Sequence, residues 1–320
     1  MDSNYLINRI FNISKSDASE LIDLVYKFQY QNNVVYQEWC NHFNNTDQYP
    51  FLPISFFKSH QVATTNFEPE IFFESSGTTK TINSKHYIKD LNLYEKSFLK
   101  TFQSFYGNIE DYCVIGLLPS YLEKGNSSLV YMVNKLIQLS KHNNSGFYLH
   151  QYQELASSLQ KLNETHQKII LFGVTYALLD FAEQFPMALN NTIIMETGGM
   201  KGRKKEFTKS EVHEILKDKF KLKEIHSEYG MTELLSQAYS RGNDRYYCPP
   251  WMKVVVRSEE DPLEIKSEGK GIINIIDLAN LYSCAFIATD DVGEVFEDGS
   301  FTIYGRLDNS DLRGCSLMLV

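Results

Sequence analysis

The sequence predicts an α/β fold with a partly parallel sheet, on three observations. From Tyr112 onward, short apolar runs alternate with amphipathic stretches, a pattern typical of strands connected by helices. Glycine and hydroxyl residues follow several of these runs, and ligands of open α/β sheets bind at the carboxyl ends of strands. Near the end of the chain, Asp298-Gly299 separates two short apolar runs, which predicts a small terminal β-hairpin.

Length and composition exclude overall disorder and argue against a nucleic-acid partner. The 320 residues can bury a large core, and the shares of hydrophobic (43%) and charged (22%) residues are usual for a folded protein. Thirty-one lysines and arginines against 40 aspartates and glutamates give a net charge of −9. Because such a chain has no overall positive field to attract a phosphate backbone, we expect no nucleic-acid partner.

The predicted elements follow in order along the chain. Residues 1–65 predict a helical lead-in, since Leu21, Val25 and Phe28 recur at helix spacing and Asp17 with Glu20 is a candidate capping pair. Residues 66–320 predict the α/β core. In it we expect helices over 152–162 and 210–220, and strands over 112–118, 169–172, 192–196, 224–227, 254–257, 271–277, 294–296 and 301–304. Because no repeat and no Pro/Gly/Ser-rich linker interrupts the chain, we expect one domain over 1–320.

Cysteine spacing and hydropathy predict a cytoplasmic protein. The five cysteines are widely spaced and form no C-x-x-C pair, so we expect reduced thiols: Cys40, Cys113, Cys248, Cys284 and Cys315. An acidic residue stands where a signal peptide has its basic region. The most apolar stretch, 272–288, is interrupted by Asn274, Asp277 and Asn280, so we expect no transmembrane segment.

The first candidate site segment is Glu74-Ser75-Ser76-Gly77-Thr78-Thr79-Lys80, which follows the apolar run 71–73. Its four hydroxyls, its backbone N–H groups around a glycine and its lysine suit a phosphate chain. An ordinary Ser/Thr/Gly turn is the alternative, because the segment lacks both the P-loop spacing and the G-x-G-x-x-G of dinucleotide folds.

Two further segments follow predicted strands. Glu196-Thr197-Gly198-Gly199 carries glycines that let the backbone approach a flat ligand closely, with a plain turn as the alternative. Ser227-Glu228-Tyr229-Gly230-Met231-Thr232-Glu233 combines an aromatic ring for stacking, a glycine for close approach, a hydroxyl for phosphate and a carboxylate for a divalent metal.

The last two segments carry groups suited to a sugar or a phosphate. Thr289-Asp290-Asp291 follows an apolar strand, and its paired acids could accept hydrogen bonds from a ribose. Gly305-Arg306-Leu307-Asp308 comes after the predicted hairpin, where the arginine could reach the same sugar or a phosphate.

In this order, the five segments resemble those of the adenylate-forming superfamily, which includes acyl-coenzyme A synthetases, peptide-synthetase adenylation domains and luciferases. The resemblance spans residues 70–320 and implies a large amino-terminal domain with two mixed β-sheets packed with helices. It also implies that the protein activates a carboxylate with ATP and magnesium.

The resemblance implies a role for each segment. Gly198, Gly199 and Tyr229 would bracket adenine, with Asp291 and Arg306 on the ribose. Thr232 would hold the α-phosphate and Glu233 the Mg²⁺ ion, so we expect both to be catalytic. The other ATP-binding residues would be those around the phosphates: Ser75, Ser76, Gly77, Thr78, Thr79, Lys80 and Gly230.

Two departures from the superfamily pattern bear on the chemistry. The superfamily continues as a mobile lid with a catalytic lysine, whereas this sequence stops soon after Gly305, so we expect no lid domain. The second glycine of the family's phosphate loop is Lys80 here. Lys80, Lys85 and His86 are candidates for the charge of the lid lysine, because they lie near the loop in sequence.

The end of the chain is similar to one branch, the acyl-protein synthetases of bacterial bioluminescence. These activate fatty acids for a fatty acid reductase complex, lack the lid and acylate a cysteine near the carboxyl terminus. The corresponding cysteine here would be Cys315, and Arg313 could favour its thiolate, which is the nucleophile in acyl transfer. A passive cysteine at a frayed end is the alternative.

These observations predict an ATP-dependent acyl-protein synthetase. It would convert a fatty acid or another apolar carboxylic acid to an acyl-adenylate and move the acyl group to Cys315 as a thioester, for delivery to a reductase subunit or carrier protein. An apolar channel for the acid is expected near 116–122. One alternative is a ligase that delivers directly to coenzyme A or a carrier protein, as in the more distantly similar phenylacetate-coenzyme A ligases. The other is a non-catalytic nucleotide-binding subunit.

Overall fold

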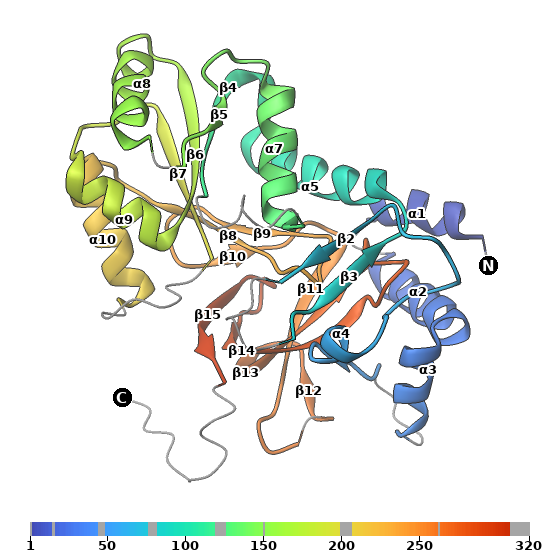
Figure 1. Ribbon diagram of the computed structural model, residues 1–320. Helices are drawn as coiled ribbons and strands as arrows, with labels where there is room; N and C mark the ends of the chain where they lie inside the picture. The colour runs from blue at the N-terminus through green and yellow to red at the C-terminus, as the bar shows by residue number, and fades with distance from the viewer. Residues whose placement is uncertain are drawn as a thin grey trace.

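The structure, a computed structural model, describes residues 2–14, 17–43, 49–75, 82–118, 126–149, 151–198, 207–261 and 263–307 (Figure 1). Over these ranges the strands form one continuous hydrogen-bonded sheet and a separate two-stranded hairpin. Helices cover part of the sheet on both faces, so the α/β class predicted from the alternating pattern is confirmed.

One part of the sheet is parallel. Its strands, in spatial order, are β5 (Gly146–Phe147), β4 (Tyr112–Leu117), β6 (Lys168–Val174), β7 (Thr192–Thr197) and β8 (His226–Tyr229). The covering helices are α5 (Leu91–Tyr106) and α7 (Ser128–Ser140) on one face, and α8 (Tyr152–Glu164), α9 (Thr175–Gln184) and α10 (Lys209–Phe220) on the other (Figure 1). Because both faces are covered, these strands are nearly continuous apolar runs, and this made most of them predictable.

The other part of the sheet is antiparallel. Its strands, in spatial order, are β9 (Ala238–Ser240), β10 (Tyr246–Tyr247), β15 (Phe301–Arg306), β14 (Phe286–Val295), β13 (Gly269–Asp277), β11 (Met252–Arg257) and β12 (Ile265–Lys266). The two sheets implied by the resemblance are therefore two parts of one path, joined through β9 and β10. The predicted terminal hairpin is β14–β15, and Gly299 in its turn has a φ of 80°.

The lead-in is helical, as predicted, with α1 (Ser3–Phe11), α2 (Ala18–Asn32) and α3 (Val34–Asn41). Asp17 does stand at the N-cap of α2, but the expected capping pair is wrong. Its carboxylate accepts a 2.6 Å hydrogen bond from the Ser14 hydroxyl, and Glu20 instead forms a 2.8 Å ion pair with Arg9. These partners compete with the backbone N–H groups that a capping box would satisfy.

Two short segments attach the lead-in to the sheet beside the predicted site. β1 (Leu52–Pro53) pairs in parallel with Ile287 and Ala288 of β14. The single-turn helix α4 (Phe56–Ser59) follows, and the ring of Phe57 packs edge-on against His86 with centroids 5.7 Å apart. His86 belongs to the hairpin of β2 (Ile71–Glu74) and β3 (Lys85–Ile88).

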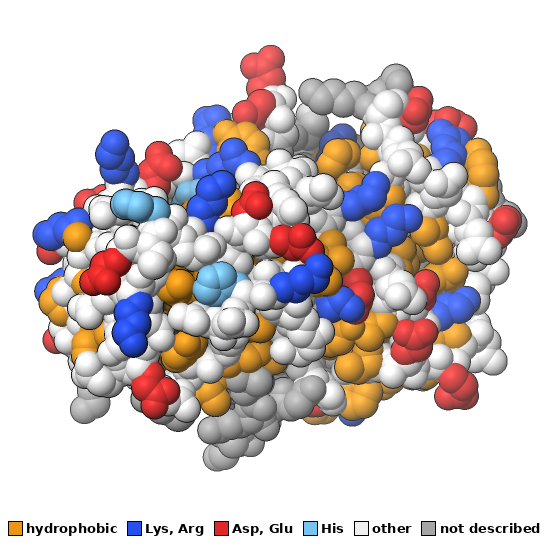
Figure 2. Space-filling view, turned by 90° about the horizontal axis from the view of Figure 1, so that it is seen from above, with side chains coloured by type: hydrophobic (Ala, Val, Ile, Leu, Met, Phe, Trp, Pro, Cys, Tyr) orange, Lys and Arg blue, Asp and Glu red, His pale blue; other side chains and the backbone are white. Residues whose placement is uncertain are grey.

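On the face shown in Figure 2, Lys and Arg side chains are interspersed with Asp and Glu side chains. In the described ranges, no helix combines the length and the apolar character needed to cross a bilayer.

Candidate active site

The carboxyl ends of β7 and β8 bring two predicted segments side by side. The strands are parallel neighbours, and the Thr197 hydroxyl donates a 2.5 Å hydrogen bond to Glu228 Oε2. Gly198 and Gly230 follow these strands directly and are exposed, so bare backbone faces solvent at both strand ends. Gly198 has a φ of 75°, a conformation that favours glycine. Gly199 lies outside the described residues.

Both strands end later than the sequence predicted. β7 includes Thr197, one residue beyond the predicted end at Glu196, and β8 runs from His226 through Tyr229 instead of over the predicted 224–227. The difference arises because these polar residues are buried at the strand ends, where side-chain partners replace water.

The described ends of the predicted phosphate loop are tied together. The N–H of Ser75 donates to the carbonyl of Ser84 at 3.1 Å, and the N–H of Ser84 donates to Ser75 Oγ at 2.9 Å. These bonds extend the β2–β3 pairing to the base of the loop. The remaining loop residues named above, Ser76, Gly77, Thr78, Thr79 and Lys80, lie outside the described residues.

The base of this loop lies against Thr232 and Glu233. The Ser84 side chain hydrogen-bonds to the Glu233 carboxylate. In β3, Nδ1 of His86 donates to the carbonyl oxygen of Thr232 at 2.8 Å, and Nδ2 of Asn280 donates to that of Glu233 at 2.7 Å. The structure therefore joins the first and third predicted segments, although His86 and Thr232 are 146 positions apart.

Three predicted segments meet at Asp291. Tyr229 Oη donates to Asp291 Oδ2, and Arg306 Nε donates to Oδ1, each at 2.8 Å. The Asp291 side chain is 5% exposed and that of Arg306 63% exposed, so the arginine closes over a buried carboxylate. Asp291 and its neighbour Thr289 lie within β14 rather than after a strand, because Phe286–Val295 is one ten-residue strand.

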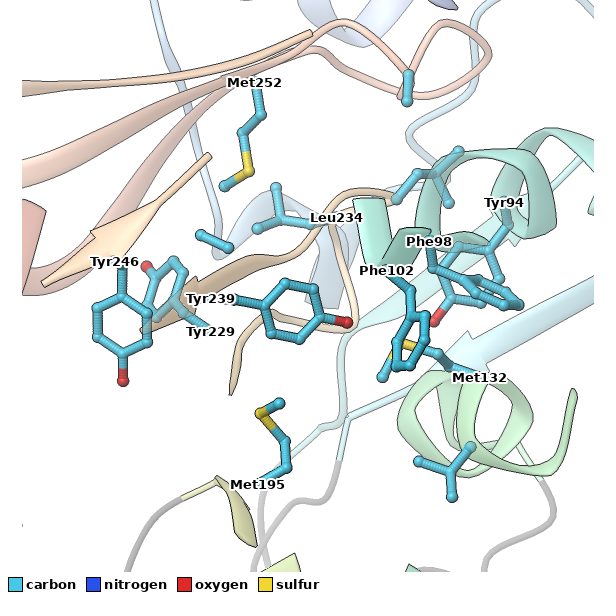
Figure 3. Close-up of a cluster of buried hydrophobic side chains, with 14 of the residues drawn as sticks. Tyr94, Phe98, Phe102, Met132, Met195, Tyr229, Leu234, Tyr239, Tyr246 and Met252 are labelled. Atoms are coloured by element: carbon cyan, nitrogen blue, oxygen red, sulfur yellow. The ribbon is translucent and has the colours of Figure 1, made fainter. Parts of the chain in front are cut away.

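The ring of Tyr229 is part of an aromatic cluster. It lies 5.6 Å from the ring of Tyr246 and 5.2 Å from that of Phe301, between centroids, and only 9% of the residue is exposed (Figure 3). Burial and the Asp291 charge raise the pKa of the Tyr229 hydroxyl well above its usual value, so the hydroxyl is a donor at neutral pH. The ring of Tyr229 is therefore largely covered by its aromatic neighbours, whereas Gly230 after it is exposed.

Glu233 fits the metal-binding role that the resemblance implies. It is 5% exposed, and burial raises its pKa, whereas the Ser84 hydrogen bond and the charges of Arg306 and Lys58 act to lower it. Mg²⁺ is usually bound by one or two carboxylates together with substrate phosphates. Among the residues that the structure describes, no three His, Cys, Asp or Glu side chains gather into a metal cluster. A single buried carboxylate beside the phosphate loop suits that mode of binding.

One predicted source of positive charge is wrong. His86 is 1% exposed, and burial lowers its pKa to about 4, so the imidazole is neutral at pH 7. Lys85 is exposed, with its ammonium 5.4 Å from the ring centroid of Phe72. The structure adds Lys58 of α4 to the candidate sources of positive charge, because its charge acts to lower the pKa of Glu233. Lys58 lies outside the five sequence motifs.

Sequence reasoning missed Asp277, at the end of β13. Its Oδ2 accepts hydrogen bonds from the N–H groups of Leu235 (2.8 Å) and Ser236 (2.9 Å), and its Oδ1 accepts one from the Ser236 hydroxyl (2.5 Å). Burial raises the pKa of this carboxyl to about 6. Asp277 thus holds the loop that carries Thr232 and Glu233. The available signal was the interruption of the apolar run 272–288 by a charged residue.

A second missed feature is a buried polar network behind β7 and β8. Glu196 accepts hydrogen bonds from Thr175 Oγ1 (2.5 Å) and Ser227 Oγ (3.2 Å), with His213 Nε2 3.9 Å away. Burial acts to raise the pKa of Glu196, but His213, Lys209 and Thr175 together lower it below its usual value. Glu196 is therefore an ionised structural residue.

The four described cysteines, Cys40, Cys113, Cys248 and Cys284, are free thiols. Burial raises the pKa of Cys40 and Cys113 to about 11 and raises that of Cys248 and Cys284 further. Such thiols are poor nucleophiles at neutral pH. Cys315 and Asp308 lie outside the described residues, and so do the last positions of the expected channel at 116–122, although Gly116, Leu117 and Leu118 are buried in and after β4.

Comparison with known proteins identifies the family. The family model described as "Acyl-protein synthetase, LuxE" matches residues 8–320. The long-chain-fatty-acid–luciferin-component ligase of Aliivibrio fischeri is 21% identical over 340 residues, covering 97% of this chain and 89% of the relative. The ligase of the same name from Vibrio harveyi is 20% identical, covering 95% and 88%.

The fold is that of adenylate-forming enzymes. ATP-bound MatB from Rhodopseudomonas palustris superimposes with a TM-score of 0.56 at 16% identity, over 73% of this chain and 47% of that one. The o-succinylbenzoate CoA synthetase of Bacillus subtilis, solved with its acyl-adenylate intermediate, gives a TM-score of 0.51 at 16% identity, over 75% and 49%. The chain thus spans about half the length of these two enzymes. With a family match over nearly the whole sequence, this protein belongs to the acyl-protein synthetase (LuxE) family.

Proposed function

We propose that this protein activates a fatty acid with ATP as an acyl-adenylate and then transfers the acyl group to its own Cys315 as a thioester. ATP-dependent fatty acid activation followed by acyl transfer is the reaction of the family to which the chain belongs. The single observation that carries the residue assignments is that both ends of the segment Tyr229–Glu233 contact other predicted segments. Glu233 contacts Ser84 at the base of the loop, and Tyr229 contacts Asp291, which also binds Arg306.

In the first step, a carboxylate oxygen of the acid attacks the α-phosphorus of ATP. An oxygen–phosphorus bond forms, the bond between the α-phosphorus and the bridging oxygen breaks, and pyrophosphate leaves. The protein mainly positions the reactants and balances charge in such a step. Thr232 would contact the α-phosphate. Ser75 and the loop that follows it would contact the outer phosphates, and Gly198 and the Tyr229 backbone would contact the adenine.

Asp291 and Arg306 would contact the ribose. In this structure both carboxylate oxygens of Asp291 already accept a hydrogen bond, so a ribose hydroxyl would share or displace the contact from Arg306. The exposed guanidinium is the one of the two partners that is free to move away. Glu233 would hold Mg²⁺, which when bound neutralises charge on the phosphates.

In the second step, the Cys315 thiolate attacks the acyl carbonyl carbon. A carbon–sulfur bond forms, the bond from the carbonyl carbon to the phosphate oxygen breaks, and AMP leaves. The raised pKa values of Cys40 and Cys113 support Cys315 as the acceptor, because thiols buried in this way stay protonated. The acylated protein would then serve a reductase subunit or carrier protein in the cytoplasm, where free thiols such as the four described here persist.

Positive charge near the phosphates would come from lysines. Lys80 and Lys85 remain candidates from the sequence, and Lys58 joins them because its charge reaches Glu233. Pyrophosphate release by Lys58→Met, Lys80→Met and Lys85→Met separates the three. A lysine whose loss leaves that rate unchanged has no role in the first step.

Intact-protein mass after incubation with ATP, Mg²⁺ and a series of fatty acids tests this proposal. We expect an acyl adduct that hydroxylamine removes, on the wild type and not on Cys315→Ser. An adduct on both proteins would contradict the assignment of Cys315. No adduct, with pyrophosphate release stimulated by coenzyme A or a carrier protein, would instead show direct delivery.

A further inference from the structure

Glu228 is a buried carboxylate to which the steps above give no role. It is 8% exposed, and its Oε2 accepts the hydrogen bond from Thr197. Among the described residues, no Lys, Arg or His side chain lies within ion-pair distance of it, and the Thr197 hydroxyl donates a hydrogen bond to Oε2 alone of its two oxygens. An unpaired buried charge is costly, so the position favours the protonated form. Burial raises the pKa of Glu228 to about 7.

Among the residues that the structure describes, the side chains around Glu228 offer no compensating positive charge. Those that interact with it electrostatically are Glu196 of β7, Tyr94 of α5, Tyr239 of β9 and Tyr246 of β10. Glu196 raises the pKa of Glu228 further, and burial keeps the three tyrosines protonated, since it raises each of their pKa values. Figure 3 shows these three tyrosines among buried apolar side chains. Of the described groups that act on Glu228, the Thr197 hydrogen bond is the one that favours the ionised form.

The carboxyl of Glu228 nevertheless lies where a ligand can reach it. A Cβ atom built on Gly230 would lie 2.4 Å from Glu228 Oε1, so the carboxyl fills the side-chain space of that glycine. Gly230 itself is exposed. A ligand that occupied the side-chain space of Gly230 would therefore meet Oε1, at the carboxyl end of β8.

This is the place where the acid substrate must stand. In the proposed function, adenine lies at Gly198 and the Tyr229 backbone, and the α-phosphate lies at Thr232. The carboxylate that attacks that phosphorus has to approach beside Gly230. An ionised Glu228 would repel it strongly, because two carboxylates at contact distance in a site of low dielectric oppose each other.

We propose that Glu228 contacts the acid substrate as a neutral carboxylic acid and donates a hydrogen bond to the substrate carboxylate. The inference rests on the proposed function for the position of the substrate. It makes Glu228 a substrate-binding residue that admits the anionic acid only while it carries its proton. After adenylation, the same O–H group can donate to the acyl carbonyl oxygen.

The pH profile of acid-dependent ATP–pyrophosphate exchange tests this role. In the wild type, the KM for the fatty acid should be constant below about pH 7 and rise about tenfold per pH unit above it, with little change in kcat. Glu228→Gln keeps a hydrogen-bond donor that does not titrate, so its KM should stay flat over the same range. Glu224→Gln changes an exposed glutamate just before β8 and should keep the wild-type profile. If the KM of Glu228→Gln rose with pH as steeply as that of the wild type, the inference would be overturned.

Two variants of neighbouring residues should move the pH at which the KM for the fatty acid begins to rise, in opposite directions. Thr197→Val removes the bond that favours ionised Glu228, so the rise should shift to higher pH. Glu196→Gln removes a negative charge that disfavours ionisation, so the rise should shift to lower pH. These variants test the inference even if Glu228→Gln fails to fold. If the KM began to rise at the wild-type pH in both variants, the inference would be overturned.

Proton uptake separates this inference from the proposed function. Above pH 7, binding of a non-hydrolysable acyl-adenylate analogue should take up a proton in the wild type and none in Glu228→Gln, as calorimetry in two buffers measures. Uptake without any acid-dependent exchange would support the inference and contradict the proposed function. Normal acid-dependent exchange without proton uptake would support the proposed function and contradict the inference.

Discussion

The hydroxyl of Tyr229 donates a 2.8 Å hydrogen bond to Asp291 Oδ2, 62 positions further along the chain. Because Tyr229 ends β8 and Asp291 lies in β14, this bond links the parallel and antiparallel parts of the sheet at the candidate site. It also keeps the carboxylate turned toward Arg306, whose Nε contacts the other oxygen. The proposed ribose contacts therefore depend on a residue from another motif.

Tyr229→Phe should weaken ATP binding. The substitution keeps the ring in its cluster and removes a hydrogen bond to a buried carboxylate, a contact worth about 1.5–3 kcal/mol. We expect the KM for ATP in pyrophosphate exchange to rise roughly tenfold or more, since 1.4 kcal/mol corresponds to a factor of ten. Tyr304→Phe is the matched control, because the hydroxyl of this exposed tyrosine contacts half-buried Glu294, away from the site. An unchanged KM for ATP in Tyr229→Phe would exclude this role.

Glu233→Gln should raise the Mg²⁺ requirement. The amide keeps the volume of the side chain and can still accept a hydrogen bond from Ser84, but it lacks the charge that would hold the ion. We expect the Mg²⁺ concentration for half-maximal exchange to increase at least tenfold, with little loss of folding stability because burial disfavours the charge that the substitution removes. If the Mg²⁺ titration coincided with that of the wild type, Glu233 would not be the ligand.

His86 should make the protein sensitive to acid. Its folded-state pKa of about 4 lies below the ordinary value of 6.5, so between these pH values the unfolded chain binds a proton that the folded chain does not. The stabilisation is complete above pH 6.5 and is lost as the pH falls toward 4, by about 3 kcal/mol for a shift of this size. His226, whose pKa is also lowered to about 4, acts in the same direction.

His86→Asn isolates this contribution. Asparagine can still donate to the Thr232 carbonyl but does not titrate, so the difference in unfolding free energy between variant and wild type should shift in favour of the variant from pH 7 to pH 4.5. Urea denaturation at several pH values measures that difference. A difference that stays constant with pH would show that His86 is not buried in the neutral form.

Buried parallel strands and amphipathic helices were predictable because their pattern is local. β4, β6 and the helices α8 and α10 lie within a few residues of their predicted ranges, since a strand covered on both faces is a continuous apolar run. The order of the five motifs likewise predicted the family, and the family match over residues 8–320 confirms it.

The predictions that were wrong concern residues whose structure depends on contacts with distant parts of the chain. The sequence does not predict β14 as one strand, because Thr289, Asp290 and Asp291 interrupt its apolar pattern. The partners that satisfy Asp291, Tyr229 and Arg306, come from other segments of the chain. The nearness of His86 to the loop in sequence predicts a cation, but that nearness does not reveal that Phe57 and Thr232 pack against the imidazole in the fold.

The measurement that tests the central claim most directly is fatty-acid-dependent ATP–pyrophosphate exchange by Cys315→Ser, beside the wild type. If the described residues perform the adenylation and the thiol acts only afterwards, the variant should exchange at a rate close to that of the wild type and form no acyl adduct. No exchange by the wild type with any fatty acid, or loss of exchange in a folded Cys315→Ser, would contradict the account.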